Sequence, residues 1–507
     1  MLTASIVKSV FDVENEARSS CPAVQLGPEI RKKLGLQALA HAKPVSHLAV
    51  ENRVSRKFVY RQAAQVQGAV DEAFAGAEED EAVLFKIPVT RAWIKQVVLA
   101  EVLLCHASFR GVIEFLEAVF DYPGLSEGSI HNIVQDAVLN SRTINATEDL
   151  SGVRVGAHDE IFQNGRPVLV GADVSSTYCY LLAAEDHRDE TTWGLHLLEL
   201  AERGLHPDYT IADGGQGLRA GQAAAWGPGV PCHGDVFHAE RELGQLAIYL
   251  EHRAWGCLSA EATLEGKIKR ARRRAKGSKF SKKLGHARKA QAQAVRLADD
   301  IAVLSDWMHH DVLSLAGPDL ATRRQLFDFI VEELRQREPL CPHRIGPVRQ
   351  KLENQRDDLL AFAAVLAEHF ADIATRLHVP ELLVQQVCEL QGFDQTTPAY
   401  WQRHEVLHRK LGGKFHDLET AVIEAMAQTP RASSHVENLN SRLRNYFFLR
   451  RHIGNDYLDL LRFFLNHRRF IRSRRPQRTG KSPAELLTGK THPHWLEMLG
   501  FQQFRRN

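Results

Sequence analysis

The sequence is poor in cysteine and has no long apolar run. Its seven cysteines are an odd number, lie far apart and form no C-x-x-C pair, which argues against a disulfide framework and a zinc ribbon. No uncharged apolar stretch approaches about 18 residues, so we expect no membrane-spanning helix. The N-terminal residues lack the basic start and apolar core of a secretory signal. We therefore expect a cytoplasmic protein with reduced cysteines.

The composition also lacks a strong bias. Hydrophobic residues make up 44% and charged residues 25% of the 507 residues, which excludes disordered and collagen-like classes. At about 150 residues per domain, the length predicts roughly three domains.

Charge is balanced over the whole chain, at a net +2, but not along it. Residues 267–289 contain twelve Lys or Arg and no acid, and residues 431–507 contain sixteen basic and five acidic residues. Residues 71–81 hold six acids and no base. Two separate basic runs indicate a polyanionic partner such as nucleic acid, although each run alone is also typical of a solvated surface. DNA as the partner would make the protein nucleoid-associated.

Two helix-turn-helix patterns precede residue 150. In residues 45–67 a break near Asn52 separates a short helix from a longer one that Ser55 is placed to cap. The start of the longer helix carries the side chains that would enter a major groove: Arg53, Arg56, Lys57, Tyr60, Arg61 and Gln62. A second pattern has its turn at residues 122–124 and Ser126 or Ser129 as the cap of its last helix. We assign 1–80 to an N-terminal DNA-binding domain and 81–150 to a second helical DNA-binding or linker region, while such helix pairs are also common core elements.

After residue 150 the pattern changes from helix to strand. Asn164 and Gly165 separate two β-rich runs and are a strong hairpin signal. The predicted strands cover 154–162, 168–173, 177–184, and the segments TIADGG and GVPCHGD. Three antiparallel strands followed by alternating helices and strands predict an α/β fold with a mixed sheet, in the order of the ribonuclease H fold. We assign 151–252 to the first part of this core, 253–430 to a large all-α insertion, and 431–507 to the second part of the core with a basic tail.

Three carboxylates stand where this sheet would bring them together: Asp159 within the first strand, Asp213 at the end of the fourth, and Glu437 on the helix after the insertion. Asp173 is typical of a structural turn, and Glu160 should face the other side of the sheet. Converging carboxylates repel one another unless a cation neutralises them, and hard oxygen ligands suit Mg²⁺ or Mn²⁺. Two such ions promote in-line phosphodiester displacement. Each acid taken alone is more often merely exposed or a helix cap.

These residues resemble the acidic triad of DDE transposases from bacterial insertion sequences. The tail FFLNHRRFIRSRRPQRTGKSPAELLTG resembles the basic helix and SPAE segment that follow the catalytic Glu in that group. Asp235 and His238 are similar to its C/D-x-x-H signature, and Arg444 matches a downstream basic residue. Pro430 and Ser433 stand where one large subgroup has Tyr and Arg, so the sequence departs from that subgroup.

The resemblance implies Mg²⁺-dependent DNA cleavage and strand transfer on double-stranded DNA, namely transposon inverted repeats and a target, by a homodimer or higher oligomer. The 224 positions between Asp213 and Glu437 are similar to the helical insertions of some transposases, which place an aromatic side chain against a flipped base. Trp255, Trp307 and Trp401 are available in this insertion, but we expect each to be buried in a core. The basic side chains expected to contact DNA beyond the N-terminal domain are Lys269, Arg270, Arg272, Arg273, Arg274, Arg450 and Arg451.

Other functions stay open. A catalytically inactive or domesticated relative would act as a sequence-specific DNA-binding regulator. The pattern Gly215-x-Gly217-x-x-Ala220 after a strand, with Asp235 further on, fits a dinucleotide-binding loop. Cys232, His233, Asp235 and His238 are a possible zinc set. The segment TGKS imitates the end of a P-loop, but Arg475 occupies the first glycine position of that motif.

Overall fold

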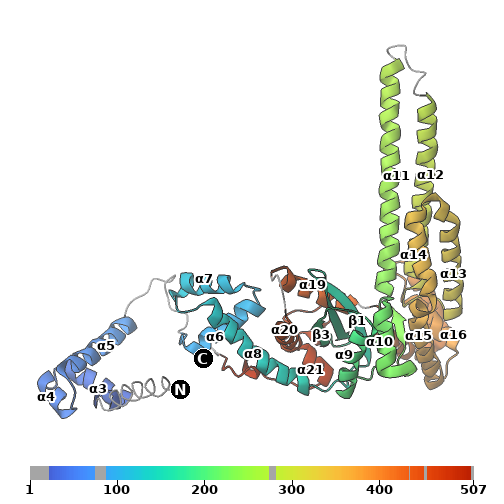
Figure 1. Ribbon diagram of the computed structural model, residues 1–507. Coiled ribbons are helices and arrows are strands. Elements are labelled where there is room, and N and C mark those ends of the chain that lie inside the picture. The colour runs from blue at the N-terminus through green and yellow to red at the C-terminus, as the bar shows by residue number, and fades with distance from the viewer. Residues whose placement is uncertain (1–21, 75–86, 273–280, 433, 450–453, 504–507) are drawn as a thin grey trace. The chain divides into compact units, whose positions relative to one another are not determined.

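The computed structural model describes residues 22–74, 87–272, 281–432, 434–449 and 454–503 (Figure 1). The chain divides into two compact units, of which the first extends to Pro88 and the second begins at Val89. Among the described residues, no helix combines the length and the apolar character needed to cross a membrane.

The first unit is a small helical domain. Its helices are α2 (Pro22–Gln25), α3 (Pro28–Leu39), α4 (Val45–Glu51) and α5 (Arg56–Phe74). The turn before α5 and its cap are as predicted, because Arg53 has a positive φ of 53° and the Phe58 amide donates to Ser55 Oγ at 3.2 Å. Gly35 lies at the crossing of α3 and α5, where a Cβ atom would lie 2.7 Å from the Gln62 carbonyl oxygen. The prediction that Gln62 projects outward is wrong, since its residue is only 6% exposed.

The second unit contains a five-stranded mixed sheet. The strands are β1 (Val155–Gln163), β2 (Arg166–Asp173), β3 (Cys179–Ala184), β4 (Tyr209–Ala212) and β5 (Cys232–Gly234). Their order is β3-β2-β1-β4-β5. Strand β2 pairs antiparallel with both β1 and β3, β4 pairs parallel with β1, and β5 pairs parallel with β4. The predicted hairpin is confirmed, because Asn164 and Gly165 both have positive φ angles, of 51° and 82°.

Helices cover both faces of this sheet. One face, with Ala157 and Ile211, shares a core with α6, α7, α8, α19, α20 and α22, and the other, with Leu169 and Tyr180, packs against α9 and α21. These helices and α10, which lies against α9, are α6 (Arg91–Leu103), α7 (Phe109–Phe120), α8 (Glu127–Thr147), α9 (Glu190–Glu202), α10 (Gln216–Trp226), α19 (Ser434–Leu449), α20 (Asn455–His467), α21 (Pro483–Thr488) and α22 (Trp495–Met498).

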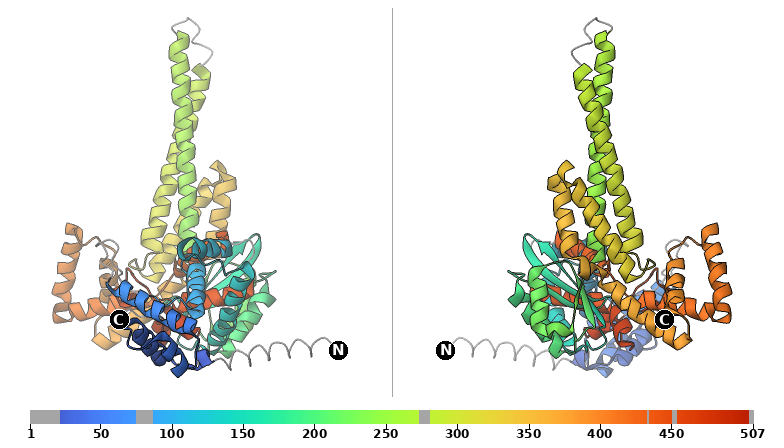
Figure 2. Two further views of the ribbon diagram at one scale, coloured as in Figure 1. Left: turned by 90° about the vertical axis from the view of Figure 1, so that its left-hand side faces the viewer. Right: turned by 90° about the vertical axis from the view of Figure 1, so that its right-hand side faces the viewer.

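In the described part of the segment between β5 and α19, the regular elements are all helices. It contains α11 (Val236–Arg272), α12 (Ser281–Trp307), the π-helix η4 (Met308–Val312), α13 (Leu320–Arg337), α14 (Pro342–Asn354), α15 (Arg356–Leu377), α16 (Glu381–Leu390), α17 (Pro398–Leu411) and α18 (Phe415–Gln428). Figures 1 and 2 show α11 and α12 side by side as a hairpin that extends well beyond the sheet and the other helices of this segment. The second unit is therefore an α/β fold with a large helical insertion.

Two expected boundaries differ from the structure. The boundary at residue 252 falls inside α11, which runs from the sheet to the hairpin tip without a break. Residues 89–147 are not separate from the sheet, because Val98, Val102 and Val134 belong to the same hydrophobic core as the strands. Sequence periodicity marks a helix and its apolar stripe but not the partner against which that stripe packs.

Asparagine side chains of α20 complete the edge strand β3. The Asn466 carboxamide accepts from the Cys179 amide and donates to the Cys179 carbonyl oxygen, both at 2.8 Å, and the Asn466 residue is fully buried. Asn455 makes the equivalent pair with Ala184, at 2.7 and 3.2 Å. The carboxamides therefore substitute for a neighbouring strand and hold the C-terminal helix against the sheet.

We predict that Asn466→Leu destabilises the protein by about 3 kcal/mol, because it leaves a buried N–H and C=O of Cys179 without partners. Urea unfolding followed by circular dichroism measures this change. The exposed Asn132 of α8 offers a matched control, and Asn132→Leu should change stability by less than about 0.5 kcal/mol. Equal stability of the two variants would contradict the role given to Asn466.

Candidate active site

Asp159 and Asp213 occupy neighbouring positions on two parallel strands. His158 of β1 is paired with Ala212, the last residue of β4. Asp159 directly follows His158, and Asp213 directly follows Ala212. Asp159 is half-buried within β1, whereas Asp213 is exposed at the end of β4. The sheet thus places two of the three predicted carboxylates on neighbouring strands, at the level where β4 ends. The carboxyl end of a parallel strand is the usual ligand position in α/β sheets.

Asn440 of α19 contacts the first of these carboxylates. Its Nδ2 donates to Asp159 Oδ2 at 2.5 Å, and the residue is fully buried. Its Oδ1 is also buried and has no hydrogen-bond partner among the described residues. Asn440 was not predicted from the sequence, because a single asparagine on a helix forms no recognisable motif. Its position three residues after Glu437 was the one available signal.

Glu437 lies on the same helix, one turn before Asn440. Apolar residues recur along this helix at helical spacing, and Val436, Leu439 and Leu443 are buried against the sheet core. Arg444 is exposed, as expected for the opposite face. The side chain of Glu437 lies outside what the structure describes, so only the backbone position of the third acid is placed beside β1.

A buried polar network supports β1 from its other face. His158 is fully buried; it is hydrogen-bonded to Tyr180 Oη at 2.9 Å and to Gln222 at 2.7 Å. Burial lowers the pKa of His158 to about 3, so the imidazole stays neutral. Gly171 makes room for this arrangement, since a Cβ atom there would lie 2.4 Å from the Tyr180 ring. The network holds β1 rigidly at the residue before Asp159.

Glu160 and Asp173, the two neighbouring acids that were not predicted to be catalytic, have structural partners. Glu160 faces away from Asn440 and accepts from Trp193 Nε1 at 3.1 Å and from Arg188 at 2.6 Å. Asp173 is fully buried at the end of β2, where its Oδ2 accepts from the amide and hydroxyl of Ser176. These contacts confirm that Glu160 points to the opposite face and that Asp173 stabilises a turn.

Asp235 and His238 form a pair at the start of α11. Asp235 is buried, its Oδ1 accepts from the Phe237 amide at 3.0 Å, and its Oδ2 lies 2.6 Å from His238 Nδ1. The Asp235 amide donates to the Ala212 carbonyl oxygen at 3.1 Å. The pair therefore caps α11 and ties it to the strand that ends at Asp213.

The four residues of the possible zinc set are not gathered at one point. Cys232 packs in the core under α9, whereas His233 stacks on Tyr209 on the other face with a centroid distance of 4.1 Å. Among the residues that the structure describes, no three His, Cys, Asp or Glu side chains are grouped so as to hold a metal ion.

The glycines after β4 have a packing role. A Cβ atom at Gly217 would lie 2.3 Å from the Arg188 carbonyl oxygen, and one at Gly221 would lie 2.6 Å from Trp193 Cβ. Both glycines allow α10 to pack closely against the start of α9. Their spacing is thus explained without a bound nucleotide.

The helical insertion lines a cavity of ≈ 650 Å³ at Asp213. Arg219 of α10 and Asp358 of α15 form an ion pair of 2.6 Å across it. The remaining lining residues are mainly polar: Gly214, Gly215, Gln216, Pro347, Gln350, Lys351, Asn354 and Gln355. Asp159 and Asn440 are not among the residues that line this cavity. The carboxylate oxygens of Asp159 and Asp213 and the Asn440 Oδ1 are hard donors of the kind that Mg²⁺ or Mn²⁺ prefers, so the chemistry of this donor set suits a divalent ion.

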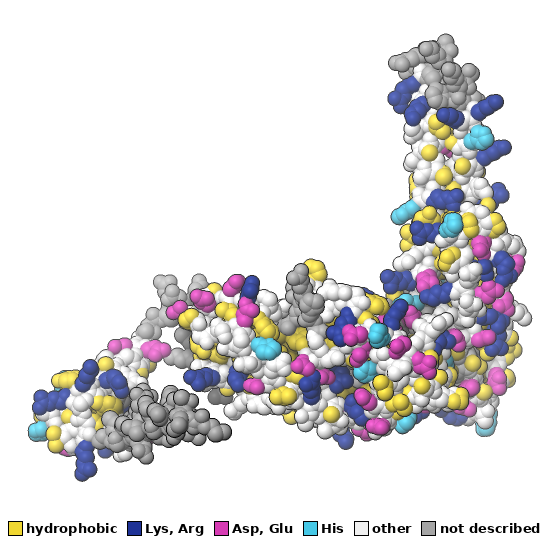
Figure 3. All heavy atoms as spheres, viewed as in Figure 1, with side chains coloured by type: hydrophobic (Ala, Val, Ile, Leu, Met, Phe, Trp, Pro, Cys, Tyr) yellow, Lys and Arg dark blue, Asp and Glu magenta, His cyan; other side chains and the backbone are white. Residues whose placement is uncertain are grey.

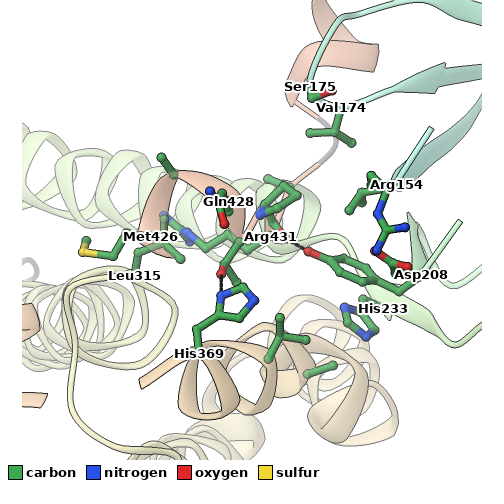
Figure 4. Close-up of a pocket in the computed structure, with 18 of the residues that line it drawn as sticks. Arg154, Val174, Ser175, Asp208, His233, Leu315, His369, Met426, Gln428 and Arg431 are labelled. Atoms are coloured by element: carbon green, nitrogen blue, oxygen red, sulfur yellow. Dashed lines mark hydrogen bonds and ion pairs between the residues drawn. The ribbon is translucent and has the colours of Figure 1, made fainter. Parts of the chain in front are cut away.

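A larger cavity, of ≈ 1210 Å³, lies at the opposite ends of β1 and β4. Figure 4 shows Arg154 and Asp208 on one of its sides and His369 on another, with Arg431 between them. Its lining includes Val155 and Tyr209, the first residues of β1 and β4, but neither Asp159 nor Asp213. A choice of candidate site by cavity volume alone would therefore point away from Asp159 and Asp213.

The residues expected to bind DNA are distributed over several surfaces. Arg53, Arg56, Lys57 and Arg61 are exposed at the start of α5, and Arg61 stacks over Phe58 at 5.6 Å. Lys269 and Arg270 are exposed near the end of α11. Arg273, Arg274, Arg450 and Arg451 lie outside the described residues, as does the side chain of Arg272.

The expectation that the insertion tryptophans are buried is wrong. Trp255, Trp307 and Trp401 are 62%, 41% and 57% exposed. Each lies on a helix that is covered on one side only, so helical periodicity around a lone tryptophan did not reveal its orientation.

The SPAE segment is a helix start with a reciprocal cap. Ser482 Oγ accepts from the Glu485 amide at 3.1 Å, and Glu485 Oε2 accepts from the Ser482 amide at 2.9 Å. Arg469 donates to Glu485 Oε1 at 2.7 Å. Burial alone would raise the pKa of Glu485, but the hydrogen bonds from Arg469 and from the amides of Ser482 and His492 outweigh it and lower the pKa to about 2.

The sequence matches no protein-family model and no curated protein.

We predict that Asn440→Ala weakens binding of Mn²⁺ by the protein about tenfold or more, because Asp159 loses the contact that orients it. Isothermal titration calorimetry with the metal alone measures this loss independently of activity. Asn445 is exposed on the same helix, so Asn445→Ala is the control and should leave binding unchanged. Equal Mn²⁺ affinities in both variants would remove Asn440 from the site.

The lowered pKa of Glu485 predicts an acid-dependent loss of stability. The ionised carboxylate stabilises the fold above its ordinary pKa of about 4.5, and this contribution disappears as the pH falls toward 2. Unfolding free energies measured from pH 6 to pH 3 should fall less steeply in Glu485→Gln than in the unaltered protein. Identical slopes would exclude Glu485 as a source of the pH dependence.

Proposed function

We propose that this protein is a DDE-type DNA transposase that cleaves transposon ends and transfers the strands with Mg²⁺ or Mn²⁺. The observation that carries the proposal is the adjacency of Asp159 and Asp213 on parallel strands, beside the helix that bears Glu437. These acids are distant in sequence, and acids that are merely exposed or that cap helices need not lie next to one another.

The sheet supports a ribonuclease H-like core for this enzyme. Its order β3-β2-β1-β4-β5, with one antiparallel hairpin meander followed by two parallel strands, has the arrangement expected for that fold. The first carboxylate stands within the central strand β1 and the second at the end of the adjacent β4. The insertion begins after β5. After it, α19 packs on the sheet face from which the Asp159 side chain projects.

The chain's own residues would perform distinct tasks in the reaction. Asn440 holds the Asp159 carboxylate, and the Asp235–His238 pair ties α11 to the strand that ends at Asp213. A divalent ion bound by the acids would neutralise charge during in-line phosphodiester displacement. Arg53, Arg56, Lys57 and Arg61 of the first unit would bind double-stranded DNA, with homodimers or higher oligomers joining two ends.

We predict that Asp159→Asn, Asp213→Asn and Glu437→Gln each reduce Mg²⁺-dependent DNA cleavage at least about 100-fold, because each removes a ligand charge from the reacting centre. Cleavage is measured on a plasmid that carries the DNA flanking the reading frame. Affinity for that DNA, measured without divalent ions, should stay within about twofold.

Asp208 offers a matched control, because it lies just before β4 at the other end of the strand from Asp213 and pairs with Arg154 at 2.8 Å. Asp208→Asn should retain cleavage. Full cleavage by the three triad variants would refute the assignment, and DNA binding without any cleavage by the unaltered protein would favour the alternative of a DNA-binding regulator.

A further inference from the structure

Helix α11 connects the candidate active site directly to a remote basic surface. The helix begins at Val236, next to Asp235, whose amide is bonded to the residue before Asp213. It then continues without interruption to Arg272. At a rise of about 1.5 Å per residue, Lys269 lies on the order of 50 Å from the start of the helix.

The hairpin of α11 and α12 is stabilised along its length. Leu250 and Ala254 of α11 share a buried core with Leu297 and Ile301 of α12. Nearer the tip, Arg288 of α12 bridges two acids of α11, with Nε 3.2 Å from Glu261 and Nη2 2.7 Å from Glu265. An antiparallel pair held in this way keeps its tip, by which we mean the described residues 267–272 and 281–289, at a defined distance from the sheet.

Beyond these acids the hairpin carries positive charge only. Residues 267–289 contain twelve basic residues and no acid. Figure 3 shows Lys and Arg gathered on the upper part of the hairpin. The exposed members that the structure describes are Lys267, Lys269, Arg270, Lys282, Lys283, Arg288 and Lys289. Such a surface matches the phosphate backbone of nucleic acid and, lacking acceptors at its side chains, does not select among bases.

We propose that the hairpin is a spacer that places this tip on the backbone of the cleaved duplex, about 15 base pairs from the cleavage site. The estimate divides the roughly 50 Å length by a rise of about 3.4 Å per base pair. The inference rests on the proposed function, because it takes the carboxylates as the point of cleavage. The hairpin would then give the insertion a contact with the DNA backbone that does not depend on base sequence, in addition to the contact of the same DNA molecule with the carboxylates.

The test compares the affinity of the full-length protein for random-sequence duplexes of about 10, 20 and 30 base pairs, in EDTA. A 10-base-pair duplex is too short to reach from the carboxylates to the tip. A short duplex can also bind at other basic surfaces of the protein, so the double variant Lys269→Gln with Lys283→Gln should lower its affinity for this duplex by no more than about twofold. It should bind the 30-base-pair duplex about tenfold more weakly, with the salt slope reduced by about 2.

The matched control is Lys410→Gln with Lys490→Gln, two lysines exposed outside the hairpin, and it should change neither value. Equal losses on short and long duplexes would overturn the spacing, and no loss on the 30-base-pair duplex would overturn the DNA contact. Because these measurements need no cleavage, failure of the proposed nuclease activity would appear separately, as retained length dependence in a protein that cuts no DNA.

Discussion

Asparagine carboxamides of the C-terminal helices, buried at Asn440 and Asn466 and exposed at Asn455, dock these helices onto the sheet of the second unit. Asn466 and Asn455 pair with the backbone of the edge strand β3, and Asn440 binds the carboxylate of Asp159 on the central strand. An unpaired polar group in these positions would be costly, so each bond specifies one placement of the helices. Residues separated by more than 270 positions thereby meet in a single core.

This docking explains how the sheet tolerates a long insertion. The chain leaves the sheet at β5 and returns at α19, and the two ends are joined by a hydrogen bond from the Val236 amide to the Arg431 carbonyl oxygen at 3.2 Å. With entry and exit fixed side by side, the insertion packs its own cores and contributes Arg219's partner Asp358 at the Asp213 cavity. The insertion is therefore part of the candidate site as well as an appendage.

Local elements could be predicted because their signals are local. The cap at Ser55, the turn at Asn164 and Gly165, and the apolar stripe of α19 each depend on residues within one or two turns of one another. Contacts across the chain could not be predicted in this way. Asn440 has no distinguishing neighbours in the sequence, and Gln62 is buried because Gly35 lets another helix approach it closely. The insertion tryptophans are exposed although their helices pack into cores.

The succession of helices and strands, the separate basic and acidic runs, the acids worth considering and the opposite facing of Asp159 and Glu160 follow from the order of the residues. Folding was needed to show that α19 is the helix that contacts Asp159, that the segment after residue 89 belongs to the sheet core, and that the basic residues 267–272 lie at the far end of α11. The physical reason is that periodicity and capping act over a few residues, whereas burial and long-range hydrogen bonds depend on which surfaces meet when the chain folds.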